Sequence, residues 1–265
     1  MTRIKLTLAY TGTAYAGWQA QSAGMARGTI QSEVEKAIAV LTGAHIRIHG
    51  AGRTDAGVHA EAQAAHFDPP ETSNICDWRK ALNANLPGDI RILEAVRVPE
   101  DFDARRSATG KRYAYTLYTG KDAIPPRLAP YAWGVRPLDV PAMHEAAALL
   151  AGRHDFASFR NVGTPVLSTT RTLYAITEEP GRAAAFLCPP SWPVTTWFFE
   201  GDGFLKQMVR NLMGLLVWVG EGKIAPAAIP AIREKQDRKA LPSPAAPPQG
   251  LTLMQVMYAA KQATP

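Results

Sequence analysis

Apolar and polar side chains alternate from residue 3 to residue 10. One face of this segment carries Ile4, Leu6, Leu8 and Tyr10. The opposite face carries basic side chains. A period of two residues is typical of a half-buried β-strand, so the pattern predicts a strand here with one face in the core.

The next segment has helical spacing. Apolar side chains recur every four residues at Ile30, Val34 and Ile38. Thr29 precedes them and can cap a helix, and Gly43 can end it. The sequence therefore predicts a helix between Thr29 and Gly43.

The remaining pattern continues this mixture of strands and helices. Strands are expected at 45–49, 62–67, 90–98, 111–119, 171–177, 195–199 and 251–257, and helices at 78–83, 142–151 and 205–219. The proline-rich segments 179–193 and 243–248 are expected to be loops. This order indicates an α+β fold with antiparallel-rich sheets, helices on one face, and the other face free to bind.

Composition supports a globular protein of one or two domains. With 265 residues, 46% hydrophobic and 20% charged, the chain is neither a disordered tail, a collagen-like fibre nor a disulfide-dense miniprotein. Two domains are the better interpretation of this length. We place them at residues 1–105 and 106–265.

Basic charge is concentrated in the second of these parts. The net charge of the whole chain is +6, with a pI near 9.4. Residues 1–105 hold 11 Lys and Arg against 12 Asp and Glu, a net charge of −1, and residues 106–265 hold 18 against 11, a net charge of +7. Nucleic acid is therefore a reasonable partner, although a basic enzyme without such a partner would have the same charge.

Cysteine usage and hydropathy favour a cytoplasmic protein without a membrane span. Cys76 and Cys188 are far apart and belong to no C-x-x-C pair, which fits a reducing compartment. No signal peptide is expected, because the first residues alternate instead of forming a long apolar run. The most apolar stretch, 212–219, is far shorter than the about 18 residues that a membrane span needs.

The segment 50–60 is the strongest candidate for chemistry. Three glycines surround the triplet Arg53, Thr54 and Asp55 directly after an expected strand. Such density of glycine permits close approach of the backbone to a ligand. The alternative is a tight turn in which Asp55 caps local amides.

Other catalytic motifs do not fit the chain. Gly110 and Lys111 do not complete a phosphate-binding P-loop. His59 and Glu61 match the H-x-E of zinc deaminases, but the P-C-x-x-C that supplies further ligands is missing. No G-x-S-x-G hydrolase motif occurs.

Arg210 is a charged residue within an apolar helix pattern. Gly214 follows one turn later and leaves space on the same face. A buried guanidinium needs an anionic partner, because an uncompensated charge is costly. Asp55 is the partner we expect, and the alternative is that Arg210 reaches solvent.

Tyr113 lies in an expected strand beside basic neighbours. It shares one face with Tyr115 and Leu117. An aromatic side chain on a strand is more often part of the core than of a catalytic site. Periodicity does not decide which face meets a ligand.

Several motifs along nearly the whole chain resemble the tRNA pseudouridine synthase A family. The most specific is Gly-Arg-Thr-Asp-Ala-Gly-Val-His-Ala at 52–60. The others are Tyr-x-Gly-x-x-Tyr-x-Gly-Trp-Gln at 10–19, Thr-Ile-Gln at 29–31, Phe-Asp-Ala-Arg at 102–105, Asp-Phe-Ala-Ser-Phe at 155–159, Arg-Thr at 171–172, Gly-Phe-Leu at 203–205, Met-Val-Arg at 208–210 and Ala-Pro-Pro-Gln-Gly-Leu at 246–251. Thr11 stands where many members have Asp, and the proline-rich stretch 180–193 looks longer than usual.

The resemblance implies the isomerisation of uridine to pseudouridine at positions 38 to 40 of the tRNA anticodon stem-loop. It implies two similar α/β halves, an RNA-binding cleft between them, a homodimer, and no metal or organic cofactor. By similarity Asp55 is the nucleophile, Arg53 belongs to the same loop, Tyr113 packs on or deprotonates the base, and Arg210 pairs with Asp55. The substrate-binding residues expected from the resemblance are Tyr113, Arg53, Arg112 and Lys111.

Two other functions are weighed against this one. A noncatalytic RNA-binding protein on the same scaffold would have no need for an acidic residue facing phosphates. A glycoside hydrolase would need two carboxylates about 5 to 9.5 Å apart, and only Glu61 lies close in sequence to Asp55.

Overall fold

The chain divides into two compact units in a computed structural model. The first unit holds Met1–Thr109 and Leu253–Pro265, and the second holds Gly110–Thr252. The structure describes residues 3–19, 28–161, 163, 166–181, 189 and 191–259. The sequence interpretation set its boundary at 105 and 106 and assigned the whole C-terminal part to the second domain.

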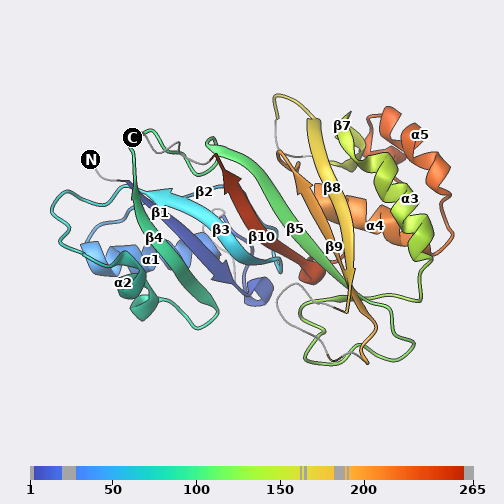
Figure 1. Cartoon of the computed structure of the whole chain (residues 1–265). Helices are drawn as coiled ribbons and strands as arrows, with labels where there is room; N and C mark the ends of the chain where they lie inside the picture. The colour runs from blue at the N-terminus through green and yellow to red at the C-terminus, as the bar shows by residue number, and fades with distance from the viewer. Residues whose placement is uncertain are drawn as a thin grey trace, which may run out of the picture. The chain divides into compact units, whose positions relative to one another are not determined.

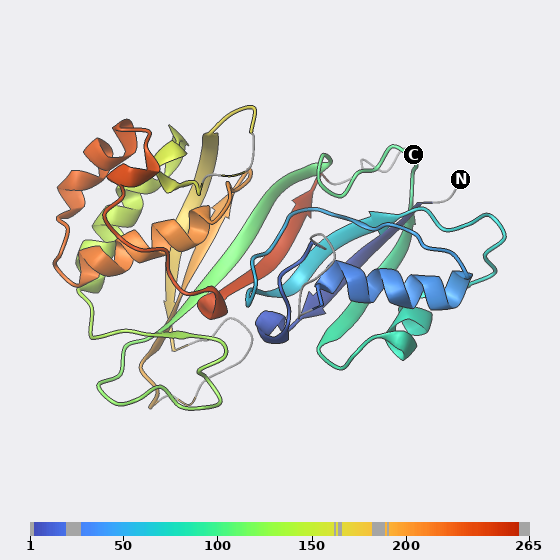
Figure 2. The ribbon, with the colours of Figure 1, turned by 180° about the vertical axis from the view of Figure 1, so that it is seen from behind.

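A sheet with helices on one face forms the first unit (Figure 2), and its β1 runs antiparallel to β3 and β4. The strand order within this unit is β4-β1-β3-β10, and β2 pairs with β3. The elements are β1 (Arg3–Tyr10), α1 (Ile30–Thr42), β2 (His49–Gly50), β3 (His59–Phe67), α2 (Trp78–Asn85), β4 (Ile90–Val98) and most of β10 (Leu251–Tyr258). A short 3-10 helix, η1 (Gly12–Ala14), follows β1.

The predicted first strand is confirmed. Every second residue of β1 is buried, from Ile4 to Tyr10. The strand lies between β3 and β4 and runs antiparallel to both. Its alternation therefore reflects one face packed against the helices and one face left open.

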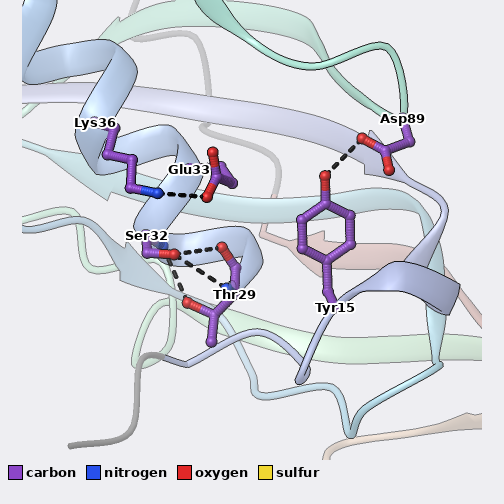
Figure 3. A network of polar contacts seen from close by, with 6 residues as sticks. All are labelled: Tyr15, Thr29, Ser32, Glu33, Lys36 and Asp89. Atoms are coloured by element: carbon purple, nitrogen blue, oxygen red, sulfur yellow. Dashed lines mark hydrogen bonds and ion pairs between the residues drawn. The ribbon is translucent and has the colours of Figure 1, made fainter. Parts of the chain in front are cut away.

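The predicted helix after Thr29 is also confirmed, with both of its ends. Figure 3 shows its start, where Thr29 and Ser32 bond to each other. The backbone N–H of Ser32 donates to the Thr29 hydroxyl at 3.1 Å, and the N–H of Thr29 donates to the Ser32 hydroxyl at 3.0 Å. These reciprocal bonds satisfy donors that a helix start leaves without partners. At the other end Gly43 has φ +70°, the left-handed conformation that favours glycine.

The strand predicted at 45–49 is wrong except for its last residue, since only His49 enters β2. The backbone of Ile48 bonds with side chains of α1 instead of a neighbouring strand. Its N–H donates to Glu35 Oε1 at 3.0 Å, and its carbonyl accepts from Gln31 Nε2 at 3.3 Å. Alternating side chains cannot reveal such a substitution of partners.

The second unit repeats the plan of a sheet with helices on one face (Figures 1 and 2). Its strand order is β5-β9-β8-β7, all antiparallel, with β6 added parallel to β5. The elements are β5 (Ala108–Tyr118), β6 (Trp133–Gly134), α3 (Val140–Leu150), β7 (Gly152–Asp155), β8 (Thr170–Pro180), β9 (Val194–Gly201), α4 (Met208–Gly220) and α5 (Ile229–Glu234), with 3-10 turns η2 (Ala157–Phe159), η3 (Pro226–Ala228), η4 (Arg238–Ala240) and η5 (Pro248–Gly250). The predicted α+β class with mainly antiparallel pairing is confirmed.

Some boundaries in the second unit differ from the prediction. The helix expected from 205 begins at Met208, because Gln207 takes the left-handed conformation with φ +59° and no helix can pass through it. The expected loop 179–193 begins later, since β8 extends to Pro180 and pairs there with Thr195. Residues 182–188 and 190 of that loop, Cys188 included, lie outside the described residues.

No helix among the described residues is both long enough and apolar enough to cross a membrane. The apolar stretch 212–219 forms most of α4, which has 13 residues. Its side chains are buried in the second unit, Leu212, Leu215 and Leu216 among them.

Candidate active site

Asp55 lies on the loop between β2 and β3 in the first unit. The side chains of this loop differ in exposure: Arg53 is exposed, Asp55 is half-buried and Thr54 is buried. The N–H of Val58 donates to the backbone carbonyl of Asp55 at 3.2 Å and closes a turn. Asp55 is thus a half-buried residue on a loop that is anchored beside it.

Backbone contacts from the segment after β1 hold this loop. The N–H of Trp18 donates to the carbonyl of Thr54 at 3.0 Å. A Cβ on Gly17 would lie 2.6 Å from that carbonyl oxygen, and a Cβ on Gly12 would lie 1.9 Å from the carbonyl oxygen of Val58. Both positions therefore need glycine because two backbones touch there.

The holding segment is itself attached to α1 and to the loop before β4. The first two N–H groups of α1, at Ile30 and Gln31, donate to the carbonyls of Gly17 and Trp18 at 3.1 and 2.9 Å. The hydroxyl of Tyr15 donates to Asp89 at 2.6 Å (Figure 3). Burial, reinforced by Asp89, raises the pKa of Tyr15 above its ordinary range, so its hydroxyl stays a donor.

A buried hydrogen bond between two hydroxyl groups also holds the loop that carries Asp55. Tyr10 and Thr54 share a hydrogen bond of 2.9 Å between their hydroxyl oxygens. Gln63 Nε2 donates to the carbonyl of Gly52 at 2.9 Å. Burial raises the pKa of Tyr10, which keeps the pair neutral, and a buried neutral pair positions the loop without introducing charge.

Tyr113 lies on β5 in the second unit, where its ring is buried, with 7% of the residue exposed. It meets the ring of Phe204 edge to face, with centroids 5.1 Å apart and an interplanar angle of 82°. Tyr115, on the same face, donates its hydroxyl to the carbonyl of Pro247 at 2.7 Å. Burial raises the pKa of Tyr115, and the charge of Arg210 acts in the opposite direction.

The two basic residues before Tyr113 are half-buried on the same strand. The guanidinium carbon of Arg112 lies 4.3 Å from the centre of the Phe198 ring. Its Nη2 lies 3.8 Å from Glu179 Oε1, a loose and largely exposed ion pair. Such a pair contributes little to stability. Lys111 lies opposite Gly201 in the register of β5 and β9.

Arg210 lies in the first turn of α4, and residues 244–246 lie against it. Its Nε donates to the carbonyl of Ala246 at 2.7 Å, and the N–H of Ala246 donates to the carbonyl of Arg210 at 2.9 Å. The space that the sequence predicts beside Gly214 is filled by the backbone of residues 244–246, because a Cβ there would lie 2.1 Å from the carbonyl oxygen of Pro244. The bond to Ala246 therefore fixes the position of Nε and the alkyl chain of Arg210. The two terminal nitrogens of the guanidinium take no part in this bond.

The predicted site residues therefore form two groups. Arg53 and Asp55 share one loop of the first unit, and Lys111, Arg112 and Tyr113 share β5 with Arg210 on α4 of the second unit. The predicted pairing of Asp55 with Arg210 joins residues of different units and stays a prediction.

Sequence reasoning from chemistry alone missed the residues that hold the loop. These are Gly12, Gly17 and Trp18, which have no reactive group. Their signal is the spacing of two glycines and a tryptophan just after a strand, which indicates close backbone contact. Among residues 3–19, 28–161 and the later described ranges, no group of three His, Cys, Asp or Glu side chains is arranged to hold a metal ion.

Comparison with known proteins identifies the class. A sequence profile described as tRNA pseudouridine synthase matches residues 7–105 and 146–259. The chain therefore belongs to the tRNA pseudouridine synthase family, whose members are isomerases.

Curated relatives narrow the class to one branch of the family. A protein from Oleidesulfovibrio alaskensis is 48% identical, with 97% of both chains covered. A protein from Lawsonia intracellularis is 49% identical over 97% of this chain and all of its own, and one from Myxococcus xanthus is 42% identical over 97% and 92%. All three carry the name tRNA pseudouridine synthase A, which confirms the resemblance seen in the sequence.

Proposed function

We propose that this protein isomerises uridine to pseudouridine in the anticodon stem-loop of tRNA, at positions 38 to 40, with Asp55 as the nucleophile. The observation that carries the proposal is the loop itself. It bears Asp55, a half-buried residue, within the family's most specific motif, and its backbone is held by Gly12, Gly17 and Trp18. A nucleophile needs this combination of access and fixed position.

The reaction is balanced without an external electron carrier. The C1'–N1 bond breaks, the uracil turns, and a C1'–C5 bond forms; C5 loses its proton and N1 gains one. Because the isomerisation is redox-neutral, we expect no metal or organic cofactor. Attack of Asp55 on C1', attack on C6, and removal of the C2' proton toward a glycal remain three routes to the same product.

The other site residues have supporting roles in this proposal. Arg210 pairs with Asp55, orients its carboxylate and stabilises its negative charge. Tyr113 packs on the uracil or takes a proton from it. Arg53, Lys111 and Arg112 contact the RNA backbone, with affinity that falls as salt rises.

The target uridine must leave the stacked helix before Asp55 can reach it, at a cost of a few kcal/mol. Binding energy from phosphate contacts, mainly on the more basic second part of the chain, can offset this cost. Recognition should depend more on RNA shape than on sequence. We expect a homodimer that works in the cytoplasm and receives the RNA in a basic cleft between its halves.

Replacement of Asp55 by Asn tests the proposal. Asp55→Asn keeps the size of the side chain and removes the nucleophilic charge. We expect it to bind unmodified tRNA with nearly unchanged affinity but to release no tritium from uridine labelled at C5. Asp101→Asn, which makes the same chemical change at an exposed position of the same unit, should retain full activity.

Mapping of pseudouridine in the product by nucleotide gives the position. Product only outside the anticodon arm would contradict the proposed site while keeping the enzyme class. Turnover by Asp55→Asn would exclude its role as nucleophile. RNA binding by the wild type without any product would favour the noncatalytic alternative.

A further inference from the structure

A hydrogen-bond network of amide and guanidinium groups contacts the first turn of α4. It joins Asn161, which follows η2, to Asn211 on α4 and Arg238 on η4. Asn211 is fully buried and is the residue next to Arg210. Asn211 directly follows the family motif 208–210, and it bonds to the carbonyl of Phe159 in the motif 155–159, which has no role in the chemistry proposed above.

Asn161 is the centre of these contacts. Its Oδ1 accepts from Asn211 Nδ2 and from Arg238 Nε, both at 3.2 Å. Its Nδ2 donates to Gln207 Oε1, and its backbone N–H donates to the carbonyl of Lys206 at 3.1 Å. One side chain thus bonds with the residue before the helix and with a residue inside its first turn.

Asn211 is held on both sides of its amide. Its Nδ2 also donates to the carbonyl of Phe159 at 2.8 Å, and its Oδ1 accepts from Arg238 Nη2 at 3.3 Å. Arg238 Nη1 donates to the carbonyl of Leu241 at 3.3 Å. Within the described residues, these three hydrogen bonds of Arg238 all go to amide or carbonyl oxygens. The guanidinium therefore orients its partners without neutralising a charge.

The start of α4 needs such support. Gln207 caps the helix in a left-handed conformation that is unfavourable for a residue with a side chain. The cap residue offers no side-chain hydrogen bond to the helix, and the first turn holds no acidic residue. It holds Arg210 instead, where the partial positive charge of a helix start disfavours a cation.

We propose that Asn161, Asn211 and Arg238 are positioning residues that set the direction in which Arg210 leaves α4. The network fixes the backbone on one side of Arg210, and the carbonyl of Ala246 fixes its Nε on the other. The inference rests on the proposed function, in which Arg210 acts on Asp55. A small rotation of the first turn would then misplace the guanidinium and slow the chemical step without weakening RNA binding.

Substitutions at Asn161 test the network. Asn161→Ala removes all of its side-chain bonds and should lower kcat on unmodified tRNA about tenfold to a hundredfold, with KM within about twofold of the wild-type value. Asn161→Asp keeps an oxygen for Arg238 and Asn211, and Gln207 can turn its amide to donate. That variant should keep kcat within about threefold of the wild type.

A second arginine provides the matched control. Arg233 on α5 donates to the carbonyl of Leu149 at 3.0 Å and belongs to the same unit. Arg233→Ala should leave kcat unchanged, whereas Arg238→Lys, which keeps the charge and loses the fork, should lower kcat about tenfold. Arg238→Lys also keeps the test decisive if Asn161→Ala does not fold.

The outcomes separate this inference from the proposed function. A wild-type protein that forms no pseudouridine would contradict the function. An active wild type with unchanged kcat in both Asn161→Ala and Arg238→Lys would overturn the network's role. A rise in KM at constant kcat, or an equal loss in Arg233→Ala, would also overturn it, because either result indicates general binding or stability.

Discussion

The two units hold their candidate site residues by different means. In the first unit, the loop that carries Asp55 is held by contact between backbones at Gly12 and Gly17. In the second unit, the turn that carries Arg210 is held mainly by side-chain amides and by the carbonyl of Ala246, with one close backbone contact a turn later at Gly214. Backbone contact excludes any added side chain, whereas a hydrogen-bond network accepts replacements that keep its donors and acceptors.

The largest effect is expected at Gly17. Gly17→Ala places a Cβ 2.6 Å from the carbonyl oxygen of Thr54, at a residue with φ +100°. Steric overlap and backbone strain together should lower the free energy of unfolding by about 3 kcal/mol, as measured by urea denaturation. Activity should fall as well, because the Asp55 loop loses its anchor.

Gly43 is the matched control for that substitution. It also has a positive φ, +70°, but a Cβ there meets nothing within 4 Å. Gly43→Ala should therefore cost only about 1 kcal/mol from backbone strain and leave kcat unchanged. Equal losses in the two variants would show that strain, and not contact between backbones, dominates at Gly17.

An intermediate effect is expected at Gly214. A Cβ there would lie 2.1 Å from the carbonyl oxygen of Pro244, so residues 244–246 must move. Overpacking of about 1–3 kcal/mol is partly offset by about 1 kcal/mol from the higher helix propensity of alanine. The net loss of stability should be about 1 kcal/mol.

Activity should respond more than stability in Gly214→Ala. Displacement of Ala246 moves the acceptor of the Arg210 Nε, so kcat should fall about tenfold under saturating tRNA. Gly222→Ala, at a helix end where a Cβ meets nothing within 4 Å, serves as control and should keep its kcat. Unchanged kcat in Gly214→Ala would mean that the contact with residues 244–246 does not direct Arg210.

The smallest effect is expected at an ion pair on the surface of the first unit, away from both kinds of contact. Arg3 donates to Asp68 through Nε and Nη2 at 2.8 and 2.7 Å. This hydrogen bonding holds the pKa of Asp68 below its ordinary value of 3.8. Since the pair is partly exposed, Asp68→Asn should cost less than about 1 kcal/mol at pH 7.

The pH dependence of this cost has a definite sign. A carboxylate whose pKa is lower in the folded state stabilises the fold above its unfolded pKa, and that contribution is lost as pH falls through the folded pKa. The difference in unfolding free energy between wild type and Asp68→Asn should thus be constant above about pH 5 and shrink in acid. A difference that does not change with pH would show that lost packing, and not charge, causes the effect.

Local elements were largely predictable from the sequence. The strand from Arg3 to Tyr10 and the helix between Thr29 and Gly43 follow from periodicity and capping residues, and both are confirmed. The lack of a strand at 45–48 was not predictable, because Glu35 and Gln31 take the hydrogen bonds that a neighbouring strand would offer. The start of α4 was predicted wrongly because Gln207 adopts the left-handed conformation, which a glutamine does not normally take.

The reactive residues could also be predicted from the sequence, but the residues that hold them in place could not. Asp55, Tyr113 and Arg210 could be singled out by residue type and motif. The partners of Arg210 and the residues that hold the Asp55 loop could not be identified in this way. A backbone carbonyl at Ala246 and a glycine at position 17 carry no reactive group that would mark them.

The sequence by itself determined the α+β class, the main strands and helices, the family and the reactive residue types. Each of these depends on local periodicity or on a contiguous motif, which short-range physics encodes. Only the tertiary structure decided which backbones touch the Asp55 loop and which amides surround the first turn of α4. Those contacts join residues tens of positions apart in the chain, such as Trp18 with Thr54 and Asn161 with Asn211, and their geometry exists only after the core has packed.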